Sequence, residues 1–300
     1  MAHDRPTEQH EAEHEDERDR REQHPKAVCT GPLPRLAEGT EGEVESDGPD
    51  AEDEKSDCED ARGQAYEFGV HGSDVITMKA ALFDFDETMI DLEREHDFAH
   101  RALCRDLGCN YDELPESFRF GSGRRIVDDI TEMREFFGWT VPEEDLYARR
   151  HRYFLEALSA GEGAGATLQL MPGVERAVRA LHSYGVTLAI TTSAAGDAVD
   201  LLLRRFGIRE LFSLIVDGTE VRAGKPDPEG YQLTARKLGV APHDCVVFED
   251  SHVGVLAAKA AGMYCVAVRN PRARTPQDLT AADVVLDSFE QLNVDALRAR

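Results

Sequence analysis

The sequence predicts an α/β fold in which a doubly wound parallel sheet is interrupted by an inserted α-helical cap. Three features predict it. Short, continuously apolar segments recur from residue 80 onward, amphipathic segments lie between them, and a mostly helical stretch separates the first apolar segment from the second. Strands that alternate with helices pair in parallel, because each helix carries the chain back over the sheet in a right-handed crossover. We therefore expect a Rossmann-like core.

Six short apolar segments are typical of strands that are buried on both faces. They span residues 80–85, 187–191, 214–216, 245–248, 264–268 and 283–286. Four further segments repeat apolar residues at spacings of three and four, which is the pattern of a helix with one buried face. These helices are expected at residues 175–183, 196–206, 229–238 and 253–261.

Residues 92–167 are expected to form the helical cap domain, inserted after the first strand. Apolar residues recur there at helical spacing, as at Ile126, Ile130 and Met133, and a glycine-rich joint at residues 161–165 closes the insertion. Residues 78–91 and 168–300 then form the core domain on either side of the cap.

Residues 1–77 differ in composition and are expected to form a disordered acidic tail. The first 70 residues contain 22 acidic and 8 basic residues, a net charge of −14 in a chain whose total is −25. Apolar residues are sparse, so little buried surface is available to offset the entropy cost of ordering this segment. Because Met78 stands just before the first strand, we expect that the tail is either dispensable or an over-extended reading frame.

The overall charge and the cysteines disfavour several classes of protein. Nucleic acids and anionic membranes both recruit a surplus of Lys and Arg, whereas this chain has 34 of these residues against 59 Asp and Glu. No segment approaches the roughly 18 apolar residues of a membrane-spanning helix, and the first residues lack a secretory signal. The six cysteines contain no Cys-x-x-Cys pair. We expect a cytoplasmic protein with reduced thiols and with no nucleic-acid or membrane partner.

Polar side chains gather at the ends of four predicted strands. They are Asp84 and Asp86, Thr192 and Ser193, Lys225 in the loop after the third strand, and Glu249 and Asp250. Ligands of open parallel sheets bind beyond the carboxyl ends of the strands, so these groups are expected to meet. Several carboxylates at one point need a hard cation, and oxygen-only ligands suit Mg²⁺. With a lysine and a hydroxyl, the set suits a dianionic phosphoryl group.

The same residues resemble the four motifs of the haloacid dehalogenase superfamily. Asp84-x-Asp86-x-Thr88, Thr192, Lys225 and Glu249-Asp250 stand in the order and spacing of that family. The resemblance covers about residues 78–286. It is closest to the subgroup with a helical cap after the first strand, which includes β-phosphoglucomutase and phosphoglycolate phosphatases.

The resemblance implies a Mg²⁺-dependent phosphatase that hydrolyses a small organic phosphate monoester through an aspartyl-phosphate. Asp84 would be the nucleophile, and Asp86 the general acid and then the general base. The implied metal ligands are Asp84, Asp86 (through its backbone carbonyl), Glu249 and Asp250, and the implied phosphate-binding residues are Thr192, Ser193 and Lys225. The alternative is a phosphosugar mutase of the β-phosphoglucomutase type, and a third reading is a non-catalytic binding module, against which the intact acidic set argues.

Substrate choice is expected to lie in the cap. The resemblance implies that His96 and either Arg124 or Arg125 contact the substrate, whereas the alternative for Arg124 is an ion pair with Asp128 along a helix. Glu87 departs from the glycine that most relatives carry after the second aspartate. Its carboxylate either disfavours an anionic substrate tail or points into the hinge of the cap.

Overall fold

The computed structural model describes residues 78–119, 123–160, 168–273 and 277–298. The expected acidic tail and the glycine-rich joint at residues 161–165 lie outside the described residues. None of the helices in the described ranges combines the length and the apolar character needed to cross a membrane.

A parallel sheet forms the centre of the described residues, in the strand order β3-β2-β1-β4-β5-β6. Its strands are β1 (Ala80–Phe83), β2 (Thr187–Thr191), β3 (Phe212–Val216), β4 (Cys245–Glu249), β5 (Tyr264–Val268) and β6 (Val284–Leu286). Every neighbouring pair is parallel, which confirms the predicted doubly wound sheet. From β1 the chain adds β2 and β3 on one side of β1, and then β4, β5 and β6 on its other side. This reversal of strand order beside β1 is where ligands of such sheets bind.

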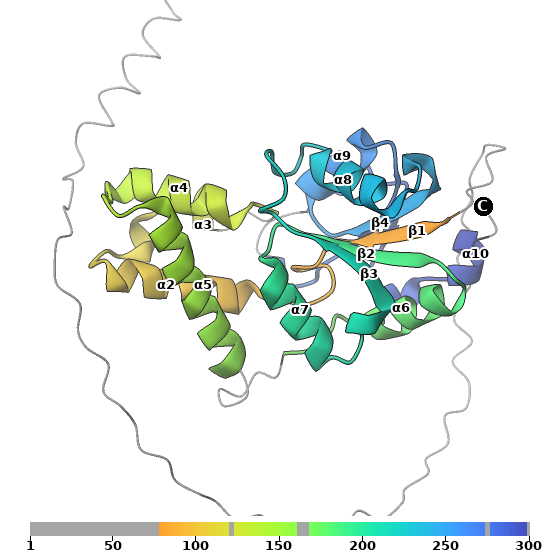
Figure 1. Ribbon diagram of the computed structural model, residues 1–300, viewed down its shortest axis with the longest axis horizontal. Helices are drawn as coiled ribbons and strands as arrows, with labels where there is room; N and C mark the ends of the chain where they lie inside the picture. The colour runs from red at the N-terminus through yellow and green to blue at the C-terminus, as the bar shows by residue number, and fades with distance from the viewer. Residues whose placement is uncertain (1–77, 120–122, 161–167, 274–276, 299–300) are drawn as a thin grey trace, which may run out of the picture.

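Helices cover both faces of the sheet, giving three layers (Figure 1). The core helices are α6 (Val174–Ser183), α7 (Gly196–Arg205), α8 (Glu229–Leu238), α9 (His252–Ala260) and α10 (Val294–Arg298). Helices α8 and α9 pack on one face, and α6, α7 and α10 lie on the other. Three short 3-10 helices lie in connections of the core, η2 (Arg209–Leu211), η3 (Pro242–Asp244) and η4 (Phe289–Gln291), and η1 (Tyr111–Glu113) follows α2 in the insertion.

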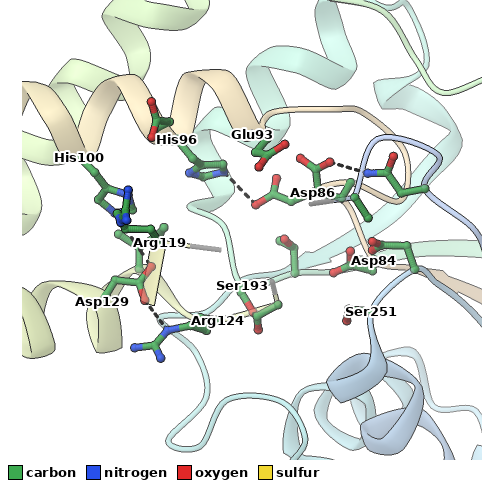
Figure 2. Close-up of a pocket in the computed structure, with 18 of the residues that line it drawn as sticks. Asp84, Asp86, Glu93, His96, His100, Arg119, Arg124, Asp129, Ser193 and Ser251 are labelled. Carbon is green, nitrogen blue, oxygen red and sulfur yellow. Dashed lines mark hydrogen bonds and ion pairs between the residues drawn. The ribbon is translucent and has the colours of Figure 1, made fainter. Parts of the chain in front are cut away.

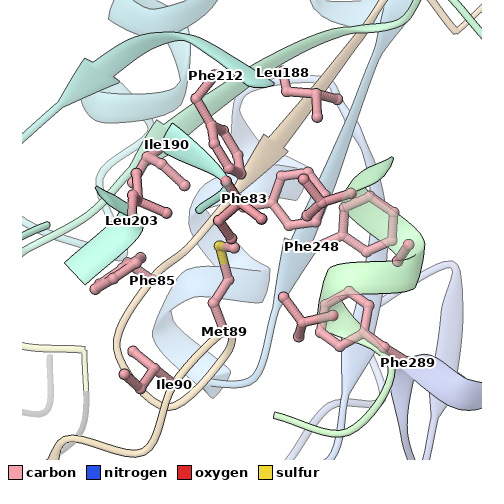
Figure 3. Close-up of a cluster of buried hydrophobic side chains, with 14 of the residues drawn as sticks. Phe83, Phe85, Met89, Ile90, Leu188, Ile190, Leu203, Phe212, Phe248 and Phe289 are labelled. Atoms are coloured by element: carbon pink, nitrogen blue, oxygen red, sulfur yellow. The ribbon is translucent and has the colours of Figure 1, made fainter. Parts of the chain in front are cut away.

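The alternation of side chains along β1 supplies both hydrophobic cores. Ala81 and Phe83 face the layer of α6 and α7, while Ala80 and Leu82 face α8 and α9, as the two-residue period of a strand requires. Phe83 stacks on Phe248 with ring centroids 4.6 Å apart (Figure 3). Burial of each such side chain is worth about 1.5–3 kcal/mol, so the strand ends are held by a closely packed core.

The insertion after β1 is helical, as the sequence predicts. Its helices are α2 (Glu93–Asp106), α3 (Glu116–Arg119), α4 (Ile126–Phe137) and α5 (Glu143–Ala160). They lie beside the sheet rather than on it, at the left of Figure 1. They enclose a hydrophobic cluster of their own, which includes Leu103, Tyr111, Phe118, Ile130, Met133, Phe137, Trp139 and Leu146. The insertion therefore has an apolar core that does not depend on the sheet.

Candidate active site

A cavity of about 150 Å³ lies between the ends of the strands and the inserted helices. The loops after β1, β2 and β4 line one side of it with Asp84, Asp86, Thr192, Ser193 and Asp250. The inserted helices and their loops line the other side with residues that include His96, His100, Arg124 and Asp129 (Figure 2). The cavity thus opens at the edge of the sheet that the sequence predicts.

Lys225 joins the carboxylates that follow β1 and end β4. Its Nζ atom lies 2.5 Å from Asp84 Oδ1 and 2.5 Å from Glu249 Oε1. All three side chains are buried. Burial alone would lower the pKa of Lys225, but Asp84 and Glu249 raise it above its ordinary value, so the ammonium stays charged. Burial would likewise raise the pKa of Glu249, yet Lys225 lowers it.

Thr88 connects the two aspartates of the site. Its hydroxyl lies 3.0 Å from Asp84 Oδ2 and 2.8 Å from Asp250 Oδ1. Burial raises the pKa of Asp84 to about 7, an effect that Glu249 and Asp86 increase and Lys225 opposes. Burial, with Glu249 and Asp84 nearby, also raises the pKa of Asp250 well above its usual range. The two carboxylates are therefore costly to ionise side by side unless a cation is present.

The donor set fits a divalent cation. Asp84, Glu249 and Asp250 each offer a carboxylate oxygen, and these oxygens lie within 4.8 Å of one another. A group of buried oxygen donors suits a hard cation such as Mg²⁺. The oxygens of Glu249 are already engaged, however: Oε1 accepts from Lys225 and Tyr231, and Oε2 accepts from the Asp250 and Ser251 amides and the Ser251 hydroxyl.

The loop after β2 brings Thr192 and Ser193 to the same cavity. The Thr192 hydroxyl accepts a hydrogen bond from the Ala194 amide at 3.0 Å, so this oxygen braces its own turn. The Ser193 hydroxyl donates to the Gly123 carbonyl of the inserted segment at 3.2 Å. Both residues also line a smaller adjoining cavity that contains Lys225. The residues expected to bind phosphate are therefore neighbours in space.

Asp86 is held by a chain of side chains that begins on α5. Arg150 lies 2.5 Å from His96 Nδ1, and His96 Nε2 lies 3.2 Å from Asp86 Oδ2. A guanidinium only donates, so Nδ1 must accept and Nε2 must carry the proton that is donated to Asp86. The other Asp86 oxygen, Oδ1, is buried and has no hydrogen-bond partner among the described residues. Arg150 is 2% exposed, and burial lowers its pKa to about 10.

The two arginines singled out in the cap occupy different places. Arg124 lines the main cavity and donates to Asp129 Oδ1 at 2.7 Å. Arg125 lies outside the lining of that cavity. It pairs with Asp128 at 2.6 Å and donates to the carbonyls of residues 221 and 222. The ion pair with Asp128, which was considered for Arg124, is therefore formed by Arg125 instead. Arg124 pairs with Asp129, the next residue of α4.

Glu87 lines the cavity, but its carboxyl group is directed to the hinge. Oε1 accepts from the Leu92 amide at 3.0 Å, just before α2, and Oε2 accepts from the Asn270 side chain at 2.6 Å. Burial, with Asp91 and other acids nearby, raises the pKa of Glu87 to about 8. Of the two roles considered for Glu87, the hinge position is the one its contacts show.

Sequence reasoning missed several residues that line or brace the site. Thr88 stands inside the first motif, so its position was visible although no role was assigned to it. Nothing in the sequence marks Arg150, His100 and Asp129, because a polar residue on a helix is normally expected to face solvent. Only the packing of the helices shows that these three are buried. Gln277 was also missed; it donates to the Asp250 carbonyl at 2.7 Å from a loop far along the chain.

Comparisons with known proteins agree with this geometry. A family model described as haloacid dehalogenase-like hydrolase matches residues 78–262. The validoxylamine A 7'-phosphate phosphatase of Streptomyces hygroscopicus subsp. limoneus is 32% identical over 71% of this chain and 95% of its own length. Hexitol phosphatase A of Escherichia coli K12 is 35% identical over 72% of this chain and 94% of its own length.

A solved structure shows the same arrangement of chain. The crystal structure of CbbY from Rhodobacter sphaeroides in complex with phosphate superposes with a TM-score of 0.65 at 28% identity. The match covers 73% of this chain and 99% of CbbY. Sheet and inserted helices therefore both have counterparts in a known protein.

Proposed function

The chain belongs to the haloacid dehalogenase-like hydrolase family and is a phosphoric monoester hydrolase. From this premise we propose that its substrates are small phosphorylated sugars, that it is Mg²⁺-dependent and that it works through an aspartyl-phosphate. The observation that carries the proposal is the convergence of Asp84, Lys225 and Asp250 at the ends of β1 and β4. Asp84 contacts Lys225 directly, and Thr88 links it to Asp250. A carboxylate nucleophile, an ammonium and a metal-binding acid then share one edge of the sheet.

In the first half of the reaction, a carboxylate oxygen of Asp84 attacks phosphorus. The new bond joins Asp84 to phosphorus, and the bond between phosphorus and the ester oxygen breaks. Asp86 gives its proton to that leaving oxygen, which departs as an alcohol. Lys225 offsets the negative charge of the nucleophile and of the phosphoryl group during the transfer.

In the second half, Asp86 acts as the base. It takes a proton from water as the water oxygen attacks phosphorus, and the bond between Asp84 and phosphorus breaks. Inorganic phosphate leaves, and Asp84 is restored. The His96 ring supports both halves, because its Nε2 proton holds the Asp86 carboxylate near the reacting atoms, while Thr192 and Ser193 would hold phosphoryl oxygens.

For the metal, we propose that Asp84, Asp250 and the Asp86 carbonyl hold Mg²⁺. When bound, the ion supplies positive charge to the phosphoryl oxygens and to the crowded carboxylates. Glu249 is the weaker candidate ligand because its oxygens already accept hydrogen bonds, so we propose that it acts by holding Lys225.

We further propose that residues 92–167 act as a cap domain over a core of residues 78–91 and 168–300. The separate hydrophobic cluster of the inserted helices supports this division. The strongly negative charge supports a small-molecule substrate without a nucleic-acid partner. The absence of any Cys-x-x-Cys pair among the six cysteines supports reduced thiols and a cytoplasmic location.

A phosphosugar mutase is the second candidate function. The contact between His96 and Asp86 supports it as well, because an acid held in this position can protonate and deprotonate sugar hydroxyls as well as water. The two functions differ in the acceptor of the phosphoryl group. A mutase would require a bisphosphate primer and would release no inorganic phosphate.

The decisive test measures phosphate release from a panel of phosphate monoesters with Mg²⁺, for the wild type and for Asp84→Asn. We expect the variant to lose at least about a thousandfold in kcat with its fold retained, since the nucleophile is gone. Chelation of the metal should abolish turnover of the wild type. Asp145→Asn, an exposed acid at the start of α5, serves as the control. Undiminished turnover of Asp84→Asn would remove Asp84 from the nucleophile role.

A further inference from the structure

The side of the cavity farthest from Asp84 is built by α2, α3 and α4, and its cations are already paired. Among the described residues that line the cavity, the cations that carry a fixed charge are Arg119 and Arg124. Arg124 donates to Asp129 and to Glu132. Arg119 donates to the Leu114 carbonyl at 3.1 Å and lies 3.4 Å from an Asp112 oxygen. Both guanidinium groups are therefore already engaged by carboxylate or carbonyl oxygens of the protein.

Acidic groups line the same wall. Glu93, Asp97 and Asp129 all face the cavity, and Asp97 pairs with Arg101 at 2.7 Å. Asp129 is 8% exposed, so its carboxylate depends on Arg124 for its countercharge. A second anionic group on the substrate would have to compete with Asp129 and Glu132 for Arg124, and it would lie close to the acids of this wall. Displacing Asp129 from Arg124 would leave a buried carboxylate without its countercharge, which is strongly unfavourable.

The remaining groups of the wall are neutral. Burial, with Arg150, His96 and Arg124 nearby, lowers the pKa of His100 well below its usual value, so the ring is uncharged at neutral pH. His100 stacks on Tyr111 with ring centroids 5.7 Å apart, and Phe118 lies beside them. A neutral imidazole, carboxylate oxygens and aromatic faces are the chemistry that suits hydroxyl groups and the C–H faces of a polyol or sugar.

From this wall we propose that the site selects monophosphates whose remainder is an uncharged polyhydroxylated group, and that Asp129 sets this selectivity by holding Arg124. The inference rests on the proposed phosphatase function and narrows its substrate class. Substrates with a second phosphate or a carboxylate are disfavoured. Asp129 is thus a specificity-determining residue of α4, remote from the reacting atoms.

The test compares kcat/KM for sorbitol 6-phosphate and glucose 6-phosphate with kcat/KM for fructose 1,6-bisphosphate and 2-phosphoglycolate. We expect the wild type to prefer the first pair by at least about tenfold, as expected where a buried charge must be unpaired. In Asp129→Asn, Arg124 becomes available to an anion, and the preference should shrink by about tenfold or more. Glu132→Gln, which alters the exposed partner of Arg124, should shift the preference in the same direction by less.

Asp128→Asn is the matched control, because Asp128 is the neighbouring acid on α4 but pairs with Arg125 outside the main cavity. Its substrate preference should stay within about twofold of the wild type. An unchanged preference in a folded Asp129→Asn variant, checked by circular dichroism, would overturn the role of Asp129. The wild-type comparison needs no variant, so it decides the substrate class even if Asp129→Asn does not fold.

The two proposals fail differently. A wild type that hydrolyses the bisphosphate or phosphoglycolate as well as the hexitol phosphate overturns the selectivity, but it leaves the phosphatase proposal intact. A wild type that releases no phosphate from any of these esters, nor from p-nitrophenyl phosphate, overturns the phosphatase proposal itself.

Discussion

At the scale of single residues, Glu87 combines an unfavourable backbone with favourable contacts. Its φ of 64° lies in the left-handed region, which costs a residue with a Cβ atom about 1 kcal/mol relative to glycine. Its carboxyl group accepts from the Leu92 amide and from the Asn270 side chain. The two hydrogen bonds of Glu87 therefore offset its backbone strain, and they connect the start of α2 with the loop after β5.

These contacts predict the effect of Glu87→Gly. The substitution relieves the strain, but it leaves the Leu92 amide and the Asn270 amide without partners, at about 1–3 kcal/mol for each buried group. We expect a net loss of about 1–5 kcal/mol in the free energy of unfolding, measured by urea denaturation. Glu87→Gln keeps one acceptor oxygen and should lose less. A Glu87→Gly protein more stable than the wild type would show that backbone strain outweighs the hinge contacts.

Residues of the site were predictable to different degrees. Asp84, Lys225 and Asp250 follow buried strands or lie in the loop after one, and parallel strand ends must meet at one edge of the sheet, so their convergence could be derived. The contacts of Thr192 could not, because whether a hydroxyl braces its turn or faces a ligand depends on loop conformation. His100 and Asp129 face the cavity only because α2 and α4 pack together, and helical periodicity does not specify how two helices are oriented.

At the scale of elements, α5 reaches the reacting groups without lining the cavity. It packs extensively along α2, which places Arg150 against His96 and so against Asp86. Arg150 also lies over the Phe154 ring, 5.1 Å from its centroid. One helix of the insertion thus fixes the tautomer of a histidine on a second helix, and that histidine holds a carboxylate of the core. The link between cap and core combines this hydrogen-bonded chain with apolar packing, because Ala99, Phe154 and Leu158 belong to the larger hydrophobic cluster beneath the sheet.

This arrangement predicts a separation of kcat from KM in Arg150→Met. Without the donor to Nδ1, the His96 ring can adopt the other tautomer and lose its hydrogen bond to Asp86. We expect kcat to fall by about ten- to a hundredfold with KM little changed, because proton transfer is affected more than binding.

Arg149→Met is the control for Arg150→Met. Arg149 is the adjacent residue of α5 but is more exposed and pairs with Asp106. Its kcat should stay near that of the wild type. Equal losses in both variants would attribute the effect to the stability of α5, and Arg150 would then have no positioning role.

At the scale of the whole molecule, the sheet could be predicted with few errors because its four central strands, β1, β2, β4 and β5, are buried along nearly their whole length. Each of the six expected strands is present, and no end differs from its expected position by more than two residues. The first strand ends at Phe83 rather than at residue 85, because residues 84–90 turn to bring Asp84 and Asp86 to the cavity. The apolar pattern of the strands thus predicts the sheet. The conformation of the polar turn after β1 depends on contacts with other loops, which the pattern does not contain.

The charge balance of the assembled site predicts how Mg²⁺ affects stability. Three buried carboxylates, Asp84, Glu249 and Asp250, face one ammonium, and burial raises the pKa of both aspartates. A dication that binds only the folded state stabilises it by about 2.7 kcal/mol at a hundred times its Kd. In a folded region of this size, that free energy raises Tm by roughly 5–10 °C.

Asp250→Asn separates metal binding from general screening of charge. The variant removes one of the crowded carboxylates while its remaining oxygen can still accept from Thr88, so we expect its Tm without metal to match or exceed that of the wild type. Added Mg²⁺ should then produce little further increase, because a ligand of the ion is lost. Thermal unfolding of both proteins is compared in MgCl₂ and in NaCl of equal ionic strength. If NaCl raises the Tm of the wild type as much as MgCl₂ does, the stabilisation is due to screening, and the carboxylates at the ends of β1 and β4 do not form a specific metal site.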